Sequence, residues 1–282
     1  MIVDLMNSTE TAQSKVAELQ QIAKELRRKS LKIIHDAGSG HPGGSLSGAD
    51  ILAALYFGVM KYDSKNPKDP KRDRFLLSKG HCTGLLYAVL ARAGYIGENE
   101  LSDYRKINSK RNLSGHPHPK TPGVEIASGS LGQGLSVAHG IALGARLDKL
   151  DYKVFVLMGD GELQEGQVWE AAMSAVKFKT NNLVAIVDFN KVAQDNMTVD
   201  LKDLEPLDEK WQSFGWDVHR IDGHNMEQVY QTLQLPLHPD KPRVIIADTI
   251  KGKGVSFMEL KTAWHGVAPS DEDYQKALKE LA

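Results

Sequence analysis

The second half of the chain alternates short apolar runs with amphipathic stretches, and this alternation constrains the fold more than any other feature. Apolar runs span 153–159, 182–190 and 243–248, and a helical pattern over 166–178 joins the first two. Continuous apolar runs are typical of strands buried on both faces, and strand–helix–strand units predict a parallel sheet. We therefore expect an α/β fold with a single doubly wound, mostly parallel sheet and helices on both faces.

The rest of the chain supplies further elements around this sheet. Helices are predicted over 9–37, 48–58, 84–93, 131–150 and 225–234, and strands over 74–78 and 216–221. Residues 61–72 and 106–130 lack periodicity, and long irregular segments in compact domains are commonly functional. No repeat or linker interrupts the pattern, so we expect residues 1–282 to form one domain, with 1–37 as a helical segment packed on it.

Composition excludes several classes of protein. A formal net charge of −1 gives no reason to expect nucleic acid or a membrane surface as partner. Cys82 is the only cysteine, which excludes an intrachain disulfide and a multi-cysteine zinc site and fits a reducing compartment. No apolar run approaches the ~20 residues that span a bilayer, and the first residues lack a signal-peptide core. We expect a soluble, cytoplasmic protein.

Two oxygen-bearing side chains follow neighbouring predicted strands. The run Gly159-Asp160-Gly161 ends one strand and Asn190 ends the next, with the 28 residues 162–189 between them. The carboxyl ends of parallel strands are where such sheets bind diphosphate cofactors, and Mg²⁺ is often shared between protein oxygens and phosphates. The connecting helix is expected to begin just after Gly161, with its N-terminus toward a phosphate. Turns alone would also explain glycine and aspartate, but spacing and context favour a Mg²⁺–diphosphate site.

A second glycine motif, Gly38-Ser39-Gly40-His41-Pro42-Gly43, matches the dinucleotide fingerprint G-x-G-x-x-G. That fingerprint must follow a strand and open a helix. Here a helical pattern precedes it, and Pro42 lacks a backbone donor. The hypothesis of a nicotinamide-dependent oxidoreductase rests on this motif alone and is disfavoured.

Four of the ten histidines, His41, His81, His116 and His265, lie beside glycine in irregular segments. Each alone is more typical of a turn, but four of them together with a diphosphate site indicate proton transfer near neutral pH. The other histidines either lack such context (His118, His219, His224, His238) or fall in helical stretches (His35, His139).

Two further segments carry alternative interpretations. The run from Gly129 to Gly134 is either a glycine-rich helix start or a place where backbone approaches a flat cofactor ring. Lys251 follows the last predicted strand, where its cation would meet a phosphate or face water.

Five motifs in this order resemble the N-terminal half of transketolase and cover the chain from about residue 30 to residue 270. They are Gly40–Gly43, Arg72–His81, Gly129–Gly134, the Gly159–Gly161 run with Asn190, and Trp264–Gly266.

The resemblance implies a role for each matching residue. Mg²⁺, or Ca²⁺ in its place, would be held by Asp160, Asn190 and the carbonyl of Val192. Thiamine diphosphate would contact His81, Gly129, Ser130, Leu131, Gly161, Glu162, Gln194 and His265, while Lys251 matches the family only in part. The catalytic set would be His41, His116 and His265, which handle protons above the thiazolium, with Glu165 linking two active sites across a dimer.

The resemblance also implies an activity, the transfer of a two-carbon ketol unit from a ketose phosphate to an aldose phosphate. Because full-length transketolases carry further domains, the chain is expected to be one half of a split transketolase that acts with a separate C-terminal subunit, in an α2β2 assembly. Xylulose 5-phosphate, of pentose phosphate metabolism, is the family default, and a specialised pentose or branched-sugar phosphate stays open. The competing hypothesis is a non-catalytic thiamine diphosphate-binding or regulatory protein.

Overall fold

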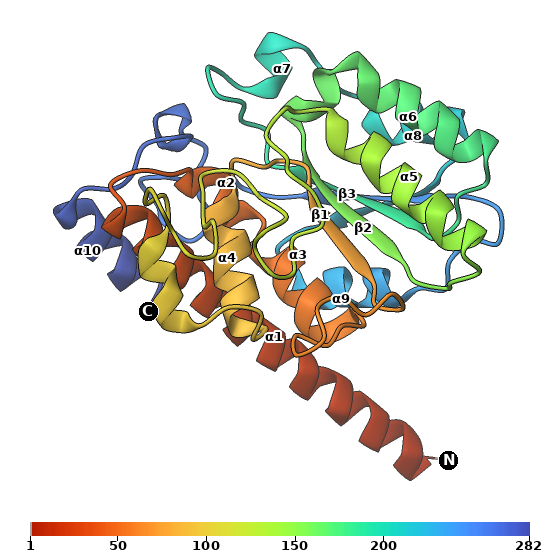
Figure 1. The fold of residues 1–282 in the computed structure, drawn as a ribbon, viewed down its shortest axis with the longest axis horizontal. Coiled ribbons are helices and arrows are strands. Elements are labelled where there is room, and N and C mark those ends of the chain that lie inside the picture. The colour runs from red at the N-terminus through yellow and green to blue at the C-terminus, as the bar shows by residue number, and fades with distance from the viewer. Residues whose placement is uncertain (1) are drawn as a thin grey trace.

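One five-stranded sheet forms the centre of the molecule, in a computed structural model that describes residues 2–282 and the side chains from residue 13 onward. All strands are parallel, in the order β1-β2-β3-β5-β4. Figure 1 labels the first three of them, with helices on either side of the sheet. The strands are β1 (Arg74–Leu77), β2 (Val154–Gly159), β3 (Leu183–Phe189), β4 (Asp217–Asp222) and β5 (Arg243–Asp248). This arrangement confirms the predicted α/β fold and is wholly parallel.

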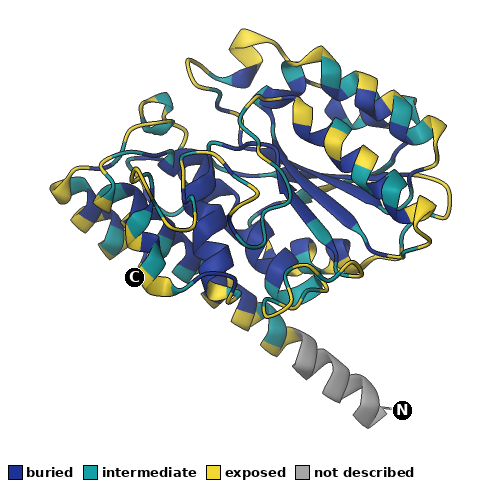
Figure 2. Ribbon diagram, viewed as in Figure 1, coloured by how far each residue is buried: buried dark blue, intermediate teal, exposed yellow. Residues whose placement is uncertain are grey.

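Helices cover both faces of the sheet, as predicted. One face carries α1 (Ile2–Asp36), α3 (Ala49–Ala54), α4 (Thr83–Arg92) and α9 (Met226–Gln234). The other face carries α5 (Gln133–Leu147), α6 (Gly166–Lys177) and α8 (Leu207–Phe214). Figure 2 shows the strands and the inner sides of the helices buried, which gives two apolar layers with the sheet between them.

The N-terminal helix α1 packs along the first of these layers. Its buried Leu19, Ile22 and Leu26 recur at three- and four-residue spacing, which places them on one face of a helix. That face contacts α3 and α4. The first twelve residues of the predicted 1–37 segment lie outside the described side chains.

The segment after α1 differs from the prediction. The glycine cluster does end α1, but a short helix α2 (Pro42–Ser47) begins within it, since proline fits the first turn of a helix, where its missing N–H is not needed. The predicted helix 48–58 is also shorter: α3 stops at Ala54 and continues as a π-helical turn, η1 (Leu55–Val59).

One expectation about the crossover helix was wrong. The turn after Gly161 is a 3₁₀ helix, η3 (Gly161–Gln164), so the amides beside Asp160 belong to η3 and not to the crossover helix. The crossover helix α6 begins at Gly166, as the helical pattern over 166–178 predicts. The pattern also missed α8 and α10 (Asp271–Glu280), although Ser270 caps α10 and acidic residues fill its first turn.

The remaining segments join these elements. Short turns of helix lie at η2 (Glu98–Asp103), α7 (Thr198–Leu201) and η4 (Thr262–Trp264). The predicted irregular segments 61–72 and 106–130 contain no helix or strand. Among the helices that the structure describes, none is long and apolar enough to cross a membrane.

Candidate active site

A cavity of about 390 Å³ lies at the carboxyl ends of the strands, the edge of the sheet at which the motifs predict a site. It brings together most of the predicted residues from segments far apart in the chain. Those on its wall are His41, His81, His116, Gly129, Leu131, Asp160, Gly161, Glu162, Asn190, Val192, Gln194, Lys251 and His265. Two predicted residues are not on this wall: Ser130 lines a neighbouring hollow, and Glu165 is exposed at the start of α6.

Asp160, directly after β2, is one of two buried carboxylates on the cavity wall, the other being Glu162, and has 2% of its surface exposed. It accepts hydrogen bonds from the amides of Gly161 (2.8 Å) and Lys191 (2.5 Å). Burial, and then the charge of Asp188, raise the pKa of Asp160 to about 6. Within the described residues Asp160 makes no ion pair, so its charge is held by two amides and by the more distant charge of Lys79.

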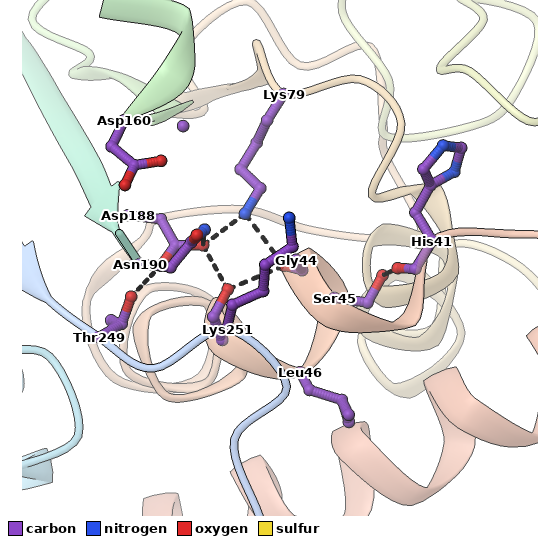
Figure 3. A network of polar contacts seen from close by, with 12 residues as sticks. His41, Gly44, Ser45, Leu46, Lys79, Asp160, Asp188, Asn190, Thr249 and Lys251 are labelled. Atoms are coloured by element: carbon purple, nitrogen blue, oxygen red, sulfur yellow. Dashed lines mark hydrogen bonds and ion pairs between the residues drawn. The ribbon is translucent and has the colours of Figure 1, made fainter. Parts of the chain in front are cut away.

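Asp188 in β3 is a further buried carboxylate, and its negative charge is fully balanced by neighbouring groups. Figure 3 shows the Lys79 ammonium bonded to both Asp188 and the carbonyl of Gly44. The hydroxyls of Ser47 (2.6 Å) and Thr249 also donate to Asp188. Burial by itself raises the pKa of Asp188, but Lys79 and these donors outweigh it and lower the pKa below its usual value.

Asn190 and Val192 continue the chain from β3 beside Asp160. The Asn190 side-chain oxygen accepts from the Val192 amide at 3.3 Å, and its amide nitrogen faces Asp188 at 3.5 Å. These contacts fix which end of the carboxamide is the oxygen. The described residues contain no group of three or more His, Cys, Asp and Glu side chains placed to bind a metal. A metal here would need amide and carbonyl oxygens besides the carboxylate.

Lys251 reaches into the cavity from the segment after β5 and is 2% exposed. Its ammonium donates to the carbonyls of Val192 (2.9 Å) and Ala193 (2.8 Å) and contacts Nδ1 of His265 at 2.7 Å. Burial, and then the nearby charge of Lys79, lower the pKa of Lys251 to about 8. No carboxylate pairs with it among the described residues, so the cavity holds a buried anion and a buried cation that do not neutralise each other directly.

Three of the glycine-flanked histidines form a cluster. The ring centroids of His41, His81 and His265 lie 5.0–5.5 Å apart, with His81 stacked on His265. Burial is the main cause that lowers the pKa of each: to about 4 for His41, to about 3 for His265, and well below its usual value for His81. All three rings are therefore neutral at physiological pH.

His116 stands apart from this cluster, on the exposed rim of the cavity. Partial loss of surrounding water, and then the charge of Arg105, lower its pKa. Its ring lies against Gly129, whose φ is +150°, and a Cβ at that position would come within 2.8 Å of the ring. Only glycine fits there, because both the backbone conformation and the space beside the ring exclude a side chain.

Glu162 is buried and braces the cavity wall. It accepts from the amides of Gly132 (2.8 Å) and Gly159 (3.2 Å) and from the Ser78 hydroxyl. These bonds hold the segment before α5, the end of β2 and the end of β1 around one carboxylate. Burial raises the pKa of Glu162.

Several residues of the site escaped the sequence reasoning. Lys79 and Asp188 carry the buried charge beneath the cavity, and Arg105 bonds to Ser39 (2.7 Å) and lies 3.4 Å from Nδ1 of His41. A signal for the first two was present: Asp188 is a charged residue inside an otherwise apolar strand, and Lys79 comes two residues after the apolar run Phe75-Leu76-Leu77. Charged residues are almost never fully buried unless paired.

Comparison with known proteins agrees with this geometry. Residues 18–282 match the family described as "Transketolase, thiamine diphosphate binding domain". The chain is 42% identical over 268 residues to one of the subunits of the apulose-4-phosphate transketolase of Phocaeicola vulgatus, covering 95% of each chain. It is 43% identical over 266 residues to the 6-deoxy-6-sulfo-D-fructose transketolase subunit SqwG of Clostridium sp. (strain MSTE9), covering 94% of this chain and 96% of the relative.

A solved structure shows the same fold. The transketolase of Campylobacter jejuni superposes with a TM-score of 0.87 at 35% identity, over 93% of this chain and 42% of the larger one. The matched region thus spans about two fifths of that transketolase. The chain belongs to the transketolase family, within which it corresponds to the thiamine diphosphate-binding domain.

Proposed function

We propose that the chain binds Mg²⁺ and the diphosphate of thiamine diphosphate and, with a separate C-terminal subunit, transfers a two-carbon ketol unit from a ketose phosphate to an aldose phosphate. The observation that carries the proposal is the pair of uncompensated buried charges in one cavity, the Asp160 carboxylate and the Lys251 ammonium. A divalent cation bound to a diphosphate complements both of them, since buried charges are normally paired or bound to metals.

The residues present suit such a metal. Asp160, the side-chain oxygen of Asn190 and the carbonyl of Val192 would hold Mg²⁺, with Ca²⁺ accepting the same oxygen ligands. The raised pKa of Asp160 supports this role, because a bound cation removes the cost of burying its charge. Each of the three oxygens keeps a free lone pair beside the hydrogen bonds described above.

The phosphates would lie between the metal and the cationic side of the cavity. Gly161, His81, His265 and Lys251 would contact them, and Gln194 would approach the cofactor from the exposed loop after β3. Gly129, Ser130 and Leu131 would support the rings, where the lack of a side chain at Gly129 leaves room. Glu162 would act at a distance by fixing the backbone of Gly132 and Gly159.

When bound, thiamine diphosphate supplies a nucleophilic carbon and an electron sink. The chain's own histidines would handle the protons of the sugar. His41 and His265 are neutral, so each has one nitrogen that accepts a proton and one that donates. His116, on the rim, would meet the part of the sugar that enters last.

A partner chain completes the proposal. The relatives from Phocaeicola vulgatus and Clostridium are both named as subunits. Exposed apolar side chains on the cavity wall, Leu131 and Leu201, suit a surface that another chain covers. We propose an α2β2 assembly in which residues 1–282 form one domain and Glu165 lies between two active sites. The two relatives are named for different sugars, and we take a pentose or branched-sugar phosphate as the substrate class.

Co-expression with a C-terminal transketolase-like chain tests this function. We expect a stable complex that transfers ketol units from xylulose 5-phosphate or apulose 4-phosphate only when thiamine diphosphate and Mg²⁺ are present, and no transfer by either chain alone. Transfer by the isolated chain would refute the need for a partner. Cofactor binding without complex formation would favour the non-catalytic binder instead.

A further inference from the structure

A buried ion pair outside the cavity links helices α1 and α3. Arg27 of α1 donates to both carboxylate oxygens of Asp50 in α3, and its Nε donates to the carbonyl of Leu46 at 3.1 Å. Both charged side chains are buried, at 8% and 6% exposure. A buried pair of this kind is weak support for stability in itself, because desolvation offsets much of the attraction. Its position relative to other groups therefore matters more than its charge.

His224, in the turn after β4, extends this pair toward the active site. Its Nδ1 lies 2.7 Å from Asp50, and its Nε2 accepts from the backbone amide of Ile250 at 2.8 Å. An amide only donates, so Nε2 is the nitrogen without a proton and Nδ1–H donates to Asp50. Asp50 thereby fixes the tautomer and the orientation of the ring, as carboxylates do for metal-binding histidines.

The amide that His224 holds is one residue before Lys251. Lys251 carries the buried ammonium that bonds to Val192 and Ala193. On its other side, the Gly252 amide donates to the carbonyl of Gly43 at 3.0 Å, close to His41. The backbone on both sides of Lys251 is thus tied, once to the histidine and once to the turn that carries His41.

We infer that His224 is a positioning residue, which holds the Ile250–Gly252 backbone so that the Lys251 ammonium faces the diphosphate end of the cavity. This inference rests on the proposed function for the identity of the ligand. The restraint on the Ile250 amide does not depend on which ligand the cavity binds. Arg27 and Asp50 act through His224, and none of the three touches the cavity.

Two near-isosteric substitutions separate the two ends of the imidazole. In His224→Gln the side-chain oxygen reaches the position of Nε2 and continues to accept from Ile250. In His224→Asn the shorter amide reaches only the position of Nδ1, so the bond to Asp50 is kept and the bond to Ile250 is lost. His238→Ala is the matched control, because His238 also accepts from a backbone amide, that of Asp240, but on the surface.

Hydrogen exchange of the Ile250 amide in the full chain, followed by NMR, tests the restraint. We expect exchange about tenfold faster in His224→Asn, because loss of one hydrogen bond shifts local opening by about that factor. His224→Gln and His238→Ala should stay within about twofold of wild type. The inference would be overturned if the Ile250 amide exchanged at the same rate in the Asn and Gln variants, whether that rate is fast or slow.

Calorimetric titration with inorganic diphosphate and Mg²⁺ tests the consequence for the site. The affinity should fall about tenfold in His224→Asn and recover in His224→Gln, with the melting temperatures of the two variants showing that both are folded. Unchanged affinity in a folded His224→Asn variant would contradict the positioning role. Absence of diphosphate binding to wild type, with or without the partner chain, would instead count against the proposed function, and the amide exchange would still decide the role of His224.

Discussion

Two buried carboxylates lie side by side at the ends of neighbouring strands, yet their surroundings differ. Asp188 in β3 pairs in register with Gly159, the residue before Asp160. Asp188 has Lys79 and two hydroxyls in contact with it, whereas the only hydrogen bonds that Asp160 accepts from the described residues come from backbone amides, with the charge of Lys79 farther away. As a result the pKa of Asp188 is lowered and that of Asp160 is raised to about 6. The compensated acid supports the fold, and the uncompensated one is available to a ligand.

The largest effect should follow from Asp188→Asn, which breaks the compensated pair. The variant leaves the Lys79 ammonium buried without its partner, and such losses cost about 3–5 kcal/mol of unfolding free energy. Urea denaturation measures this value. Asp240→Asn serves as control, since its pair with Lys179 is exposed and contributes little. A loss no larger than the control's would show that Asp188 is not the structural member of the two.

Asp160→Asn should instead raise the free energy of unfolding of the metal-free chain. A folded pKa of about 6, above the usual 3.8, means that the carboxylate disfavours folding increasingly as the pH rises from about 4 to 6. Two pKa units, less one amide bond that asparagine cannot accept, give a gain of about 2 kcal/mol at pH 7. Below about pH 4 this gain disappears, and only the cost of the missing amide bond, about 1 kcal/mol, should separate the variant from wild type.

Asp160→Asn should also weaken Mg²⁺-dependent cofactor binding, by at least about 100-fold. Loss of a group that only hydrogen-bonds to a metal ligand already lowers metal affinity by about 10–100-fold, and Asp160 is proposed as a ligand itself. Titration of the complex with thiamine diphosphate at fixed Mg²⁺ measures it. Retained affinity, or a loss of stability in the metal-free chain, would remove the distinction between the two carboxylates.

His116→Ala tests whether the exposed rim of the cavity serves the substrate while the buried end serves the cofactor. Turnover of the complex should fall about 100-fold, as expected for a group that transfers protons, while the affinity for thiamine diphosphate should not change. His118→Ala, two residues away, is the control. Loss of cofactor affinity would place His116 with the cofactor and not with the substrate.

Lys251 should give the smallest effect and a characteristic pH dependence. With a pKa of about 8, its ammonium is about nine-tenths charged at pH 7 and about one-tenth charged at pH 9, so diphosphate affinity should decline about tenfold over this range. In Lys251→Met this decline should be absent, whereas Lys253→Met should keep it. An identical pH profile in all three proteins would exclude Lys251 as a diphosphate contact.

Patterns along the chain are enough to predict the strands, the layers and most of the cavity wall. Apolar runs indicate buried parallel strands, and residues that directly follow such strands must gather at one edge of the sheet, which located Asp160 and Asn190. The glycine-flanked histidines and Gly129 were found because each motif is local in the chain. The 3₁₀ turn η3 between Asp160 and α6 and the short helix α2 were missed, because cap and turn geometry decide them.

Which charges meet depends on the tertiary structure. Lys79 follows β1 and Asp188 lies in β3, with β2 between these two strands, so nothing along the chain indicates that the two side chains pair. The contact of His224 with Asp50 joins residues 174 positions apart, and that of Lys251 with Val192 joins residues 59 apart. Periodicity and spacing record neighbours along one element, whereas the compensation of buried charge depends on which elements the fold places together. That pairing separates the supporting Asp188 from the available Asp160.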